Sequence, residues 1–135
     1  MVNIETLYTD IGREMKGICD MVYAKNRPKS VDSRPKSYIV VRLPSVILNQ
    51  EIGYDGAYND YTTTAQIEVY VRNKVSRSNA NGFDIDTTSD KVSQVLKRFP
   101  IDTENLTVVR PIVTMQADDG EGFDVTIIQG QLRTK

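Results

Sequence analysis

The chain has 135 residues, with 17 Lys and Arg against 18 Asp and Glu, 39% hydrophobic residues, one Cys and no His. This length suits a single domain over residues 1–135, and the near-neutral charge argues against a globally basic nucleic-acid-binding protein. The absence of His excludes Ser–His and Cys–His nucleophilic pairs and His-based metal sites. The sequence also lacks the glycine-rich phosphate-binding motifs GxGxxG and GxxxxGK(S/T). We therefore expect no enzymatic activity and no cofactor.

A periodic apolar stripe predicts a long first helix from about Asn3 to Lys25. Its members recur at intervals of three and four residues: Ile4, Leu7, Ile11, Met15, Ile18 and Val22. Cys19 neighbours the stripe, and we interpret it as a half-buried packing residue, because no partner for a reactive thiol is apparent. The N-terminus lacks a signal-peptide pattern, and no apolar run approaches the roughly 20 residues of a membrane span. We expect synthesis in the cytoplasm and no membrane partner.

Residues 25–37 form a basic connection that contains two prolines. The tetrapeptide Arg-Pro-Lys-Ser occurs in it twice, and no other part of the sequence concentrates positive charge to this degree. A contact with nucleic acid or with an acidic partner surface would use the four basic side chains of this repeat, Arg27, Lys29, Arg34 and Lys36. No aromatic residue is interleaved for base stacking, so a solvated linker is the favoured interpretation.

Alternating apolar residues predict strands at Tyr38–Leu43 and Thr62–Lys74. The connection between them, residues 45–61, is too long for a tight hairpin turn. It carries a set of aromatic and acidic residues, Tyr54, Asp55, Tyr58 and Tyr61. Tyrosines supply large contact areas at protein interfaces, so this set is a candidate interface. Folding of the loop back onto its own core remains the alternative.

A polar connection at residues 74–86 precedes a second helix. This helix is expected to begin near Thr87, whose hydroxyl would cap the first turn, and to end at Pro100. Carboxylates cluster before and within its first turns, at Asp84, Asp86 and Asp90. We interpret them as solvated, because they lack the ligand spacing of an EF-hand.

Two final strands are predicted at Leu106–Gln116 and Phe123–Leu132, with Asp118–Gly122 as the hairpin connection. The carboxylates of this connection are also interpreted as solvated rather than as a hard-cation site. Pro111 cannot donate a hydrogen bond to a ladder, so its strand is predicted to lie at an edge or to carry a bulge.

The order of elements predicts an α+β fold. We expect an antiparallel or mixed sheet of about four strands packed with two helices, with a long loop between the first and second strands. Two helices cannot easily cover both faces of such a sheet, so we expect apolar residues of its second face to need cover from a neighbouring subunit. These interface candidates are Val40, Tyr70, Ile112 and Ile128. On this expectation Ile128→Asp would weaken association and leave the monomer folded.

This layout resembles the tail terminators, also called tail completion proteins, of long-tailed bacteriophages. The likeness covers nearly the whole chain and is carried by an opening amphipathic helix, a short strand, the long strand Thr62–Arg72, a polar loop, one helix and a closing hairpin. It implies a structural virion protein of the neck: a ring, commonly of six subunits, that stops growth of the tail tube and presents a surface to the head. The implied partners are other copies of the chain, the tail tube protein and the head–tail connector protein, with DNA only as passing cargo.

Other assignments stay open. A head–tail adaptor or a minor tail-tube protein shares the size and the sheet-plus-helix character. From a different class, a small-molecule-sensing α+β domain fits the strand order, and an enzyme that uses carboxylates or Lys stays open as well. Such a domain should be a compact monomer or dimer with an apolar pocket, whereas a neck protein should form a ring with a wide channel.

Overall fold

The computed structural model describes residues 4–30, 33–43, 46–48, 61–73, 82 and 84–135. In chain order the elements of these residues are α1 (Ile4–Glu14), β1 (Met21–Ala24), β2 (Ser37–Arg42), β3 (Val46–Leu48), β4 (Tyr61–Arg72), α2 (Ile85–Lys97), β5 (Ile101–Asp102), β6 (Leu106–Asp118) and β7 (Phe123–Thr134). The expected α+β fold with two helices is confirmed. The sheet is larger than the four strands expected, because the short strands β1, β3 and β5 also join it.

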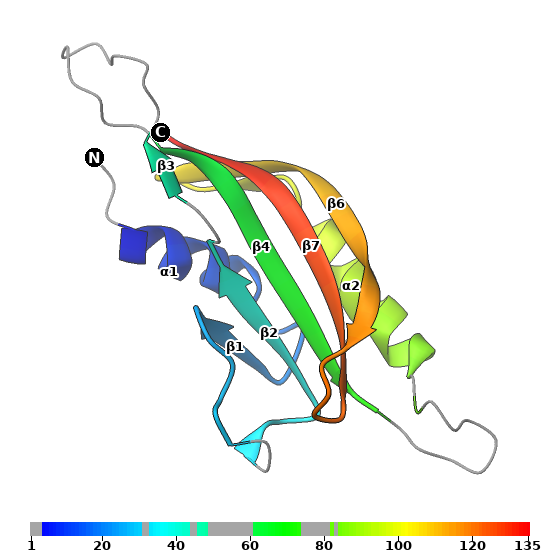
Figure 1. Ribbon diagram of the computed structural model, residues 1–135. Helices are drawn as coiled ribbons and strands as arrows, with labels where there is room; N and C mark the ends of the chain where they lie inside the picture. Colours follow the sequence, from blue (N-terminus) through cyan, green and yellow to red (C-terminus); the bar gives the residue numbers. More distant parts are fainter. Residues whose placement is uncertain (1–3, 31–32, 44–45, 49–60, 74–81, 83) are drawn as a thin grey trace.

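The strands of the described chain form one seven-stranded mixed sheet (Figure 1). Its order is β1-β2-β4-β7-β6-β5, and β3 pairs with β4 outside this path. The long strand β4 lies at the centre, antiparallel to both β2 and β7, with Ile67 opposite Val41 on one side and Ile128 on the other. Parallel pairing occurs between β1 and β2, where Val22 is opposite Ile39.

The prediction of a first helix up to Lys25 is wrong, because α1 ends at Glu14 and residues 21–24 form β1. Gly17 has a φ of +85°, which glycine adopts without the steric cost that other residues incur, and it lies in the turn between α1 and β1. Met15 and Ile18 nevertheless pack in the core, with 0% and 1% of their surface exposed. The apolar stripe therefore continues through the turn although the helix does not.

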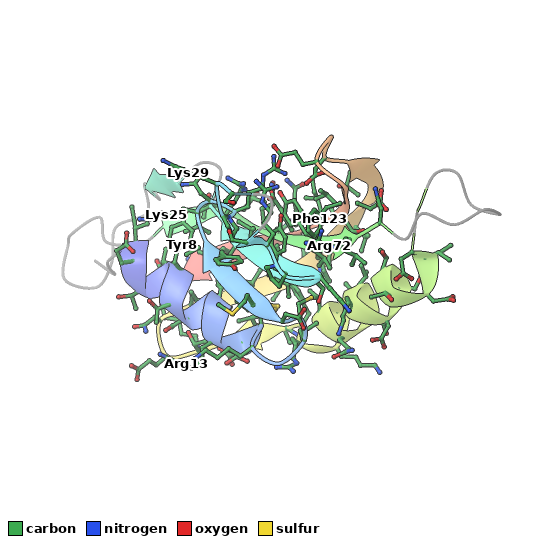
Figure 2. The ribbon with its side chains drawn as sticks, turned by 90° about the horizontal axis from the view of Figure 1, so that it is seen from below. Tyr8, Arg13, Lys25, Lys29, Arg72 and Phe123 are labelled. Atoms are coloured by element: carbon green, nitrogen blue, oxygen red, sulfur yellow. The ribbon has the colours of Figure 1, made fainter. Side chains whose placement is uncertain are left out.

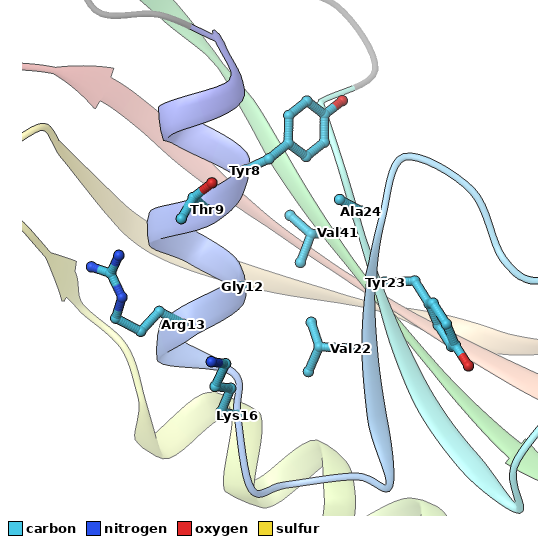
Figure 3. A pocket seen from close by; sticks show the side chains of 9 residues that line it. All are labelled: Tyr8, Thr9, Gly12, Arg13, Lys16, Val22, Tyr23, Ala24 and Val41. Carbon is cyan, nitrogen blue, oxygen red and sulfur yellow. The ribbon is translucent and has the colours of Figure 1, made fainter.

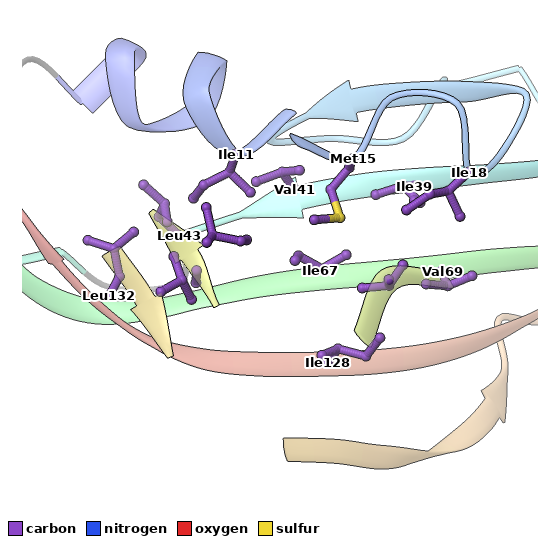
Figure 4. Packing of buried hydrophobic residues seen from close by; sticks show 14 of the residues in the cluster. Ile11, Met15, Ile18, Ile39, Val41, Leu43, Ile67, Val69, Ile128 and Leu132 are labelled. Carbon is purple, nitrogen blue, oxygen red and sulfur yellow. The ribbon is translucent and has the colours of Figure 1, made fainter. Parts of the chain in front are cut away.

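Both helices pack on the same face of the sheet. Figure 2 shows α1 and α2 below the sheet, with Lys29 and Phe123 on its other side. The core that they enclose with β2, β4 and β7 contains Ile11 from α1, Met15 from the turn after α1, and Ile67 and Ile128 from the central strands (Figure 4). Val95 of α2 belongs to the same cluster. Each large aliphatic side chain buried here stabilises the fold by roughly 1.5–3 kcal/mol.

Polar contacts fix the helices against each other and against the far end of the sheet. The Asp10 carboxylate of α1 accepts hydrogen bonds from the hydroxyl of Thr103 at 2.7 Å and the amide of Asn105 at 2.9 Å. On α2, Lys91 Nζ donates to the Ile18 carbonyl at 2.7 Å and Arg98 Nη1 donates to the Glu14 carbonyl at 2.8 Å. The turn between β5 and β6 therefore lies against α1, so the sheet curls around the helices.

The start of α2 differs from the prediction by one turn. The helix begins at Ile85, and the Asp84 side chain accepts a hydrogen bond from the Thr87 backbone N–H at 3.1 Å. Asp84 is thus the N-cap in place of Thr87, and Thr87 supplies the backbone N–H that the cap binds. A carboxylate at this position also interacts favourably with the positive end of the helix dipole.

The predicted irregularity at Pro111 is confirmed. The β6–β7 register shifts between Val109 and Ile112, and Arg110 within this shift has a φ of +55°. The bulge accommodates the residue that has no backbone N–H to donate.

The expectation that four apolar residues lack cover within the chain is wrong for three of them. Ile128 is 0% exposed, because its position opposite Ile67 places it on the helix-covered face of the sheet. Val40 and Tyr70 do lie on the second face, but they are 0% and 5% exposed and belong to a second buried cluster. Ile112 alone matches the expectation, with 67% of its surface exposed.

The positions of Ile128 and Ile112 lead to opposite predictions for the same substitution. Ile128→Asp should unfold the isolated chain, because it places a charge in a closed apolar core at a cost above about 4 kcal/mol. Ile112→Asp should change the free energy of unfolding by no more than about 0.5 kcal/mol. Urea unfolding followed by circular dichroism measures both. A folded Ile128→Asp monomer would contradict the described core.

Candidate functional site

The basic connection is tied to the turn between β6 and β7 by ion pairs. We call residues 25–36 the basic segment and residues 119–122 the acidic turn. Arg27 Nη1 lies 2.8 Å from Asp119 Oδ2, and its Nη2 lies 3.4 Å from Glu121 Oε1. Arg34 forms a second ion pair with Glu121. The sequence had favoured a solvated linker and a solvated turn, but the two segments neutralise each other.

Arg34 is the most enclosed cation of the basic segment, with only 3% of its side chain exposed. Its Nε donates to the Pro28 carbonyl at 2.9 Å, and its own carbonyl accepts from Arg72 Nη2 at 2.8 Å. Burial acts to lower the pKa of Arg34, but the hydrogen bond to Glu121 outweighs this and the pKa is raised. Arg34 therefore stays charged and holds the segment in a closed turn on the sheet.

An aromatic cluster lies beneath the basic segment on the second face of the sheet. The Tyr38 ring stacks on Tyr70 with centroids 4.5 Å apart, and it meets Phe123 and Tyr23 edge to face at 5.3 and 5.7 Å. Arg27 lies over the Tyr70 ring, 5.8 Å from its centroid. The cover that we expected from a neighbouring subunit at Val40 and Tyr70 thus comes from aromatic and cationic side chains of the same chain.

A buried carboxylate extends this face toward the middle of β4. Glu68 is 6% exposed, and its two oxygens accept hydrogen bonds from Arg42 Nε at 2.9 Å, the Tyr70 hydroxyl at 2.9 Å and Gln66 Nε2 at 2.5 Å. Gln129 Nε2 donates in turn to Gln66. Every contact compensates the desolvation of the Glu68 charge, which is what a buried carboxylate requires.

The acidic turn is built by its own side chains. Asp119 Oδ1 accepts from the backbone N–H groups of Glu121 at 2.7 Å and Phe123 at 3.1 Å, and Gly120 and Gly122 take φ values of +77° and +93°. Only 4% of the Asp119 side chain is exposed. Within the described residues, no three or more Cys, Asp or Glu side chains gather in a position to hold a metal ion. The carboxylates here stabilise the turn and form ion pairs with the basic segment.

The ion pairs of Arg34 should contribute measurably to stability. We expect Arg34→Ala to lower the free energy of unfolding by roughly 2–4 kcal/mol, since it leaves Glu121 without its cation and opens the cover of the aromatic cluster. Lys29→Ala is the matched control, because Lys29 is exposed and has no ion pair with a described residue. It should change stability by no more than about 0.5 kcal/mol. Equal effects of the two substitutions in urea unfolding would contradict the structural role of Arg34.

The Tyr38 hydroxyl has no hydrogen-bond partner among the described residues, although the ring is fully buried. An unsatisfied buried hydroxyl is unfavourable, so Tyr38→Phe should raise the free energy of unfolding by about 1 kcal/mol. Tyr70→Phe is the matched control, because it deletes the hydrogen bond to Glu68 and should lower stability by about 1–2 kcal/mol.

Tyr38→Phe should also change how stability depends on pH in the alkaline range. Burial raises the pKa of Tyr38 from 10.0 to about 12. Between these two values the unfolded chain loses the proton while the folded chain keeps it, so this group makes stability fall as the pH rises. Thermal unfolding at pH 9.5 and 11 should show a smaller loss for Tyr38→Phe than for the unaltered chain. An identical pH slope would contradict the burial of the hydroxyl.

The outer edge of β6 is uncovered over much of its length. Strand β5 pairs only with Val108 and Thr107, and no described strand pairs with that edge beyond Val108. Ile112 and Val113 are 67% and 45% exposed, and because they are consecutive they point to opposite faces of the sheet. The strand therefore presents apolar surface on both faces and a free backbone edge between them.

A groove of about 270 Å³ lies between α1 and β1 (Figure 3). Its helix side is formed by Tyr8, Thr9, Gly12, Arg13 and Lys16, its strand side by Val22, Tyr23 and Ala24, and Val41 of β2 also lines it. Nothing in the periodicity of the sequence indicated this groove, because the sequence had been interpreted as one continuous helix across these residues.

The predicted site residues divide into those the structure places and those it does not. Arg27 and Arg34 meet at the acidic turn, whereas Lys29 and Lys36 are exposed. Tyr54, Asp55 and Tyr58 lie outside the described residues, as does the side chain of Tyr61 at the start of β4. Sequence reasoning missed the partners of the basic segment, and the one available signal was that its charge is opposite to that of residues 118–121.

Cys19 behaves as the sequence indicated. It is half-buried against the core, and burial raises the pKa of its thiol to about 11. The thiol is therefore protonated and weakly reactive at neutral pH.

Comparison with protein-family models and with curated proteins gives no match to this chain. None of the helices in the described ranges combines the length and the apolar character needed to cross a membrane.

Proposed function

We propose that the chain is a tail terminator of a long-tailed bacteriophage: a neck subunit that forms a ring on the tail tube, stops its growth and joins it to the head. The observation that carries this proposal is the uncovered edge of β6. The proposed partners are other copies of the chain, the tail tube protein and the head–tail connector protein, within the virion and with DNA only passing through.

A free strand edge with apolar flanks is unfavourable for a protein that acts as a monomer. Such edges promote pairing with other chains and are usually short, charged or covered. Here Pro111 and the bulge at Arg110 disrupt one part of the edge, but Ile112 and Val113 follow directly and are exposed. Full burial of such a side chain is worth roughly 1.5–3 kcal/mol. A neighbouring copy gains the part of this that corresponds to the exposed surface of each residue, and a ring repeats that gain around its axis.

The second face of the sheet offers a different kind of contact. Lys29, within the basic segment, and Arg72 are exposed on this side of the molecule (Figure 2). Exposed cations favour approach of an acidic protein surface. This face is therefore suited to the tail tube or connector protein, while the apolar β6 edge is suited to another copy.

The decisive variant is Ile112→Asp. It should leave the monomer folded and weaken self-association at least tenfold, because it places a charge on the proposed contact. Ile4→Asp is the matched control: Ile4 is also exposed, at 38%, but it lies at the start of α1, across the sheet from β6 (Figure 1). Sedimentation velocity with and without purified tail tubes measures the association, and electron microscopy tests for a ring with a channel. An unaltered chain that stays monomeric with tail tubes present would contradict the proposed function.

A further inference from the structure

The groove between α1 and β1 has the features of a site for an extended peptide. Val22 and Ala24 point to one face of β1 and Tyr23 to the other, yet all three line the groove. The groove therefore reaches the outer edge of β1. This strand lies at one edge of the sheet and pairs only with β2 among the described strands. A peptide lying in the groove can add to the sheet through the backbone of β1.

Gly12 keeps the groove open on the helix side. A Cβ atom at this position would lie 3.8 Å from Val22 Cγ1, an ordinary van der Waals contact, so alanine would fit without a clash. Glycine inside a helix is less stable than alanine by roughly 0.5–1 kcal/mol. The helix thus carries a glycine, which lowers its stability, at a position where a larger side chain would narrow the groove.

The charge of the groove favours an acidic occupant. The Arg13 side chain is 64% exposed, and its nearest carboxylate oxygen, on Asp10, is 3.8 Å away and belongs to a carboxylate that Thr103 and Asn105 already bind. Lys16 is exposed and has no ion pair within the described parts of the chain. Two cations with little neutralisation therefore border the peptide path.

One segment of the sequence has the complementary chemistry. Residues 49–60 contain three acidic residues, Glu51, Asp55 and Asp60, with no Lys or Arg, and they carry Tyr54 and Tyr58 beside Ile52. The segment joins β3 to β4. The other long connection, residues 74–81, carries Lys74 and Arg77 and no acid, so its charge repels the groove.

We propose that the α1–β1 groove of one subunit binds residues 49–60 of a neighbouring copy, with the acidic side chains against Arg13 and Lys16. This inference rests on the proposed function and specifies one subunit contact within it. Because donor segment and groove are different surfaces of the same chain, the contact is head-to-tail. Head-to-tail contacts close into rings when the rotation between subunits permits.

A peptide titration tests the groove directly. A labelled, end-blocked peptide of residues 49–60 is titrated with the full chain and followed by fluorescence anisotropy. Binding should weaken about tenfold for the double variant Arg13→Glu and Lys16→Glu, and similarly for a peptide that carries the neutral substitutions Glu51→Gln, Asp55→Asn and Asp60→Asn. The matched control is Lys29→Glu with Lys97→Glu, two exposed cations away from the groove, which should bind the peptide as the unaltered chain does. Peptide binding that is absent, or unchanged in the groove variant, overturns the inference.

Charge exchange shows whether the contact joins two copies. One chain carries Arg13→Glu and Lys16→Glu, and a second chain carries Glu51→Lys, Asp55→Lys and Asp60→Lys. Each alone should lose assembly in sedimentation velocity, and an equimolar mixture should regain it, because each segment then meets a groove of opposite charge. Assembly of both single chains, or no recovery in the mixture, overturns the contact between copies.

The two proposals can fail separately. If the unaltered chain forms rings and the charge variants do too, the groove contact is wrong while the proposed function stands. If the unaltered chain stays monomeric even with tail tubes, the proposed function fails, and the contact between copies fails with it whatever the peptide titration shows.

Discussion

The need to cover both faces of the central sheet determines most of this structure. The strands β2, β4 and β7 carry apolar side chains on both sides, but α1 and α2 both pack on one side. The other side is closed by the basic segment, held by the pairs of Arg27 and Arg34 with the acidic turn. Loss of these pairs would uncover the aromatic cluster around Tyr38. The ion pairs are therefore structural because they position a cover, and their direct electrostatic gain is secondary.

The parts of the fold that could be predicted are those whose signal lies within one element. The alternation in β4 and the missing N–H of Pro111 both act locally, and the structure confirms both. The first helix was overpredicted because the stripe continues to Val22, while pairing of β1 with β2 is a long-range interaction that periodicity does not register. The strands β3 and β5 have three and two residues, too few for an alternation to be recognised.

The candidate site was less predictable because its partners are distant in sequence. Arg34 and Glu121 are 87 positions apart, and only the hairpin geometry of β6 and β7 brings the acidic turn to the basic segment. The face of a side chain also depends on register. Ile128 was assigned to the second face, but pairing with Ile67 places it in the core, and a shift of one residue would have reversed this. The composition indicated which charged and apolar side chains are present, and the pairing of the strands determined where they lie.

The charges of this chain differ in how strongly salt should affect them, so folding and the proposed assembly should respond differently to ionic strength. Arg34, Asp119 and Glu68 have 3%, 4% and 8% of their side chains exposed, so their interactions are poorly screened. Arg13 is 64% exposed at the edge of the groove, and at physiological ionic strength the Debye length is only about 8 Å. A contact that uses Arg13 and Lys16 should therefore weaken with salt over a range in which the fold is unchanged. A subunit with this division can fold independently of its neighbours and still assemble through contacts that ionic strength regulates.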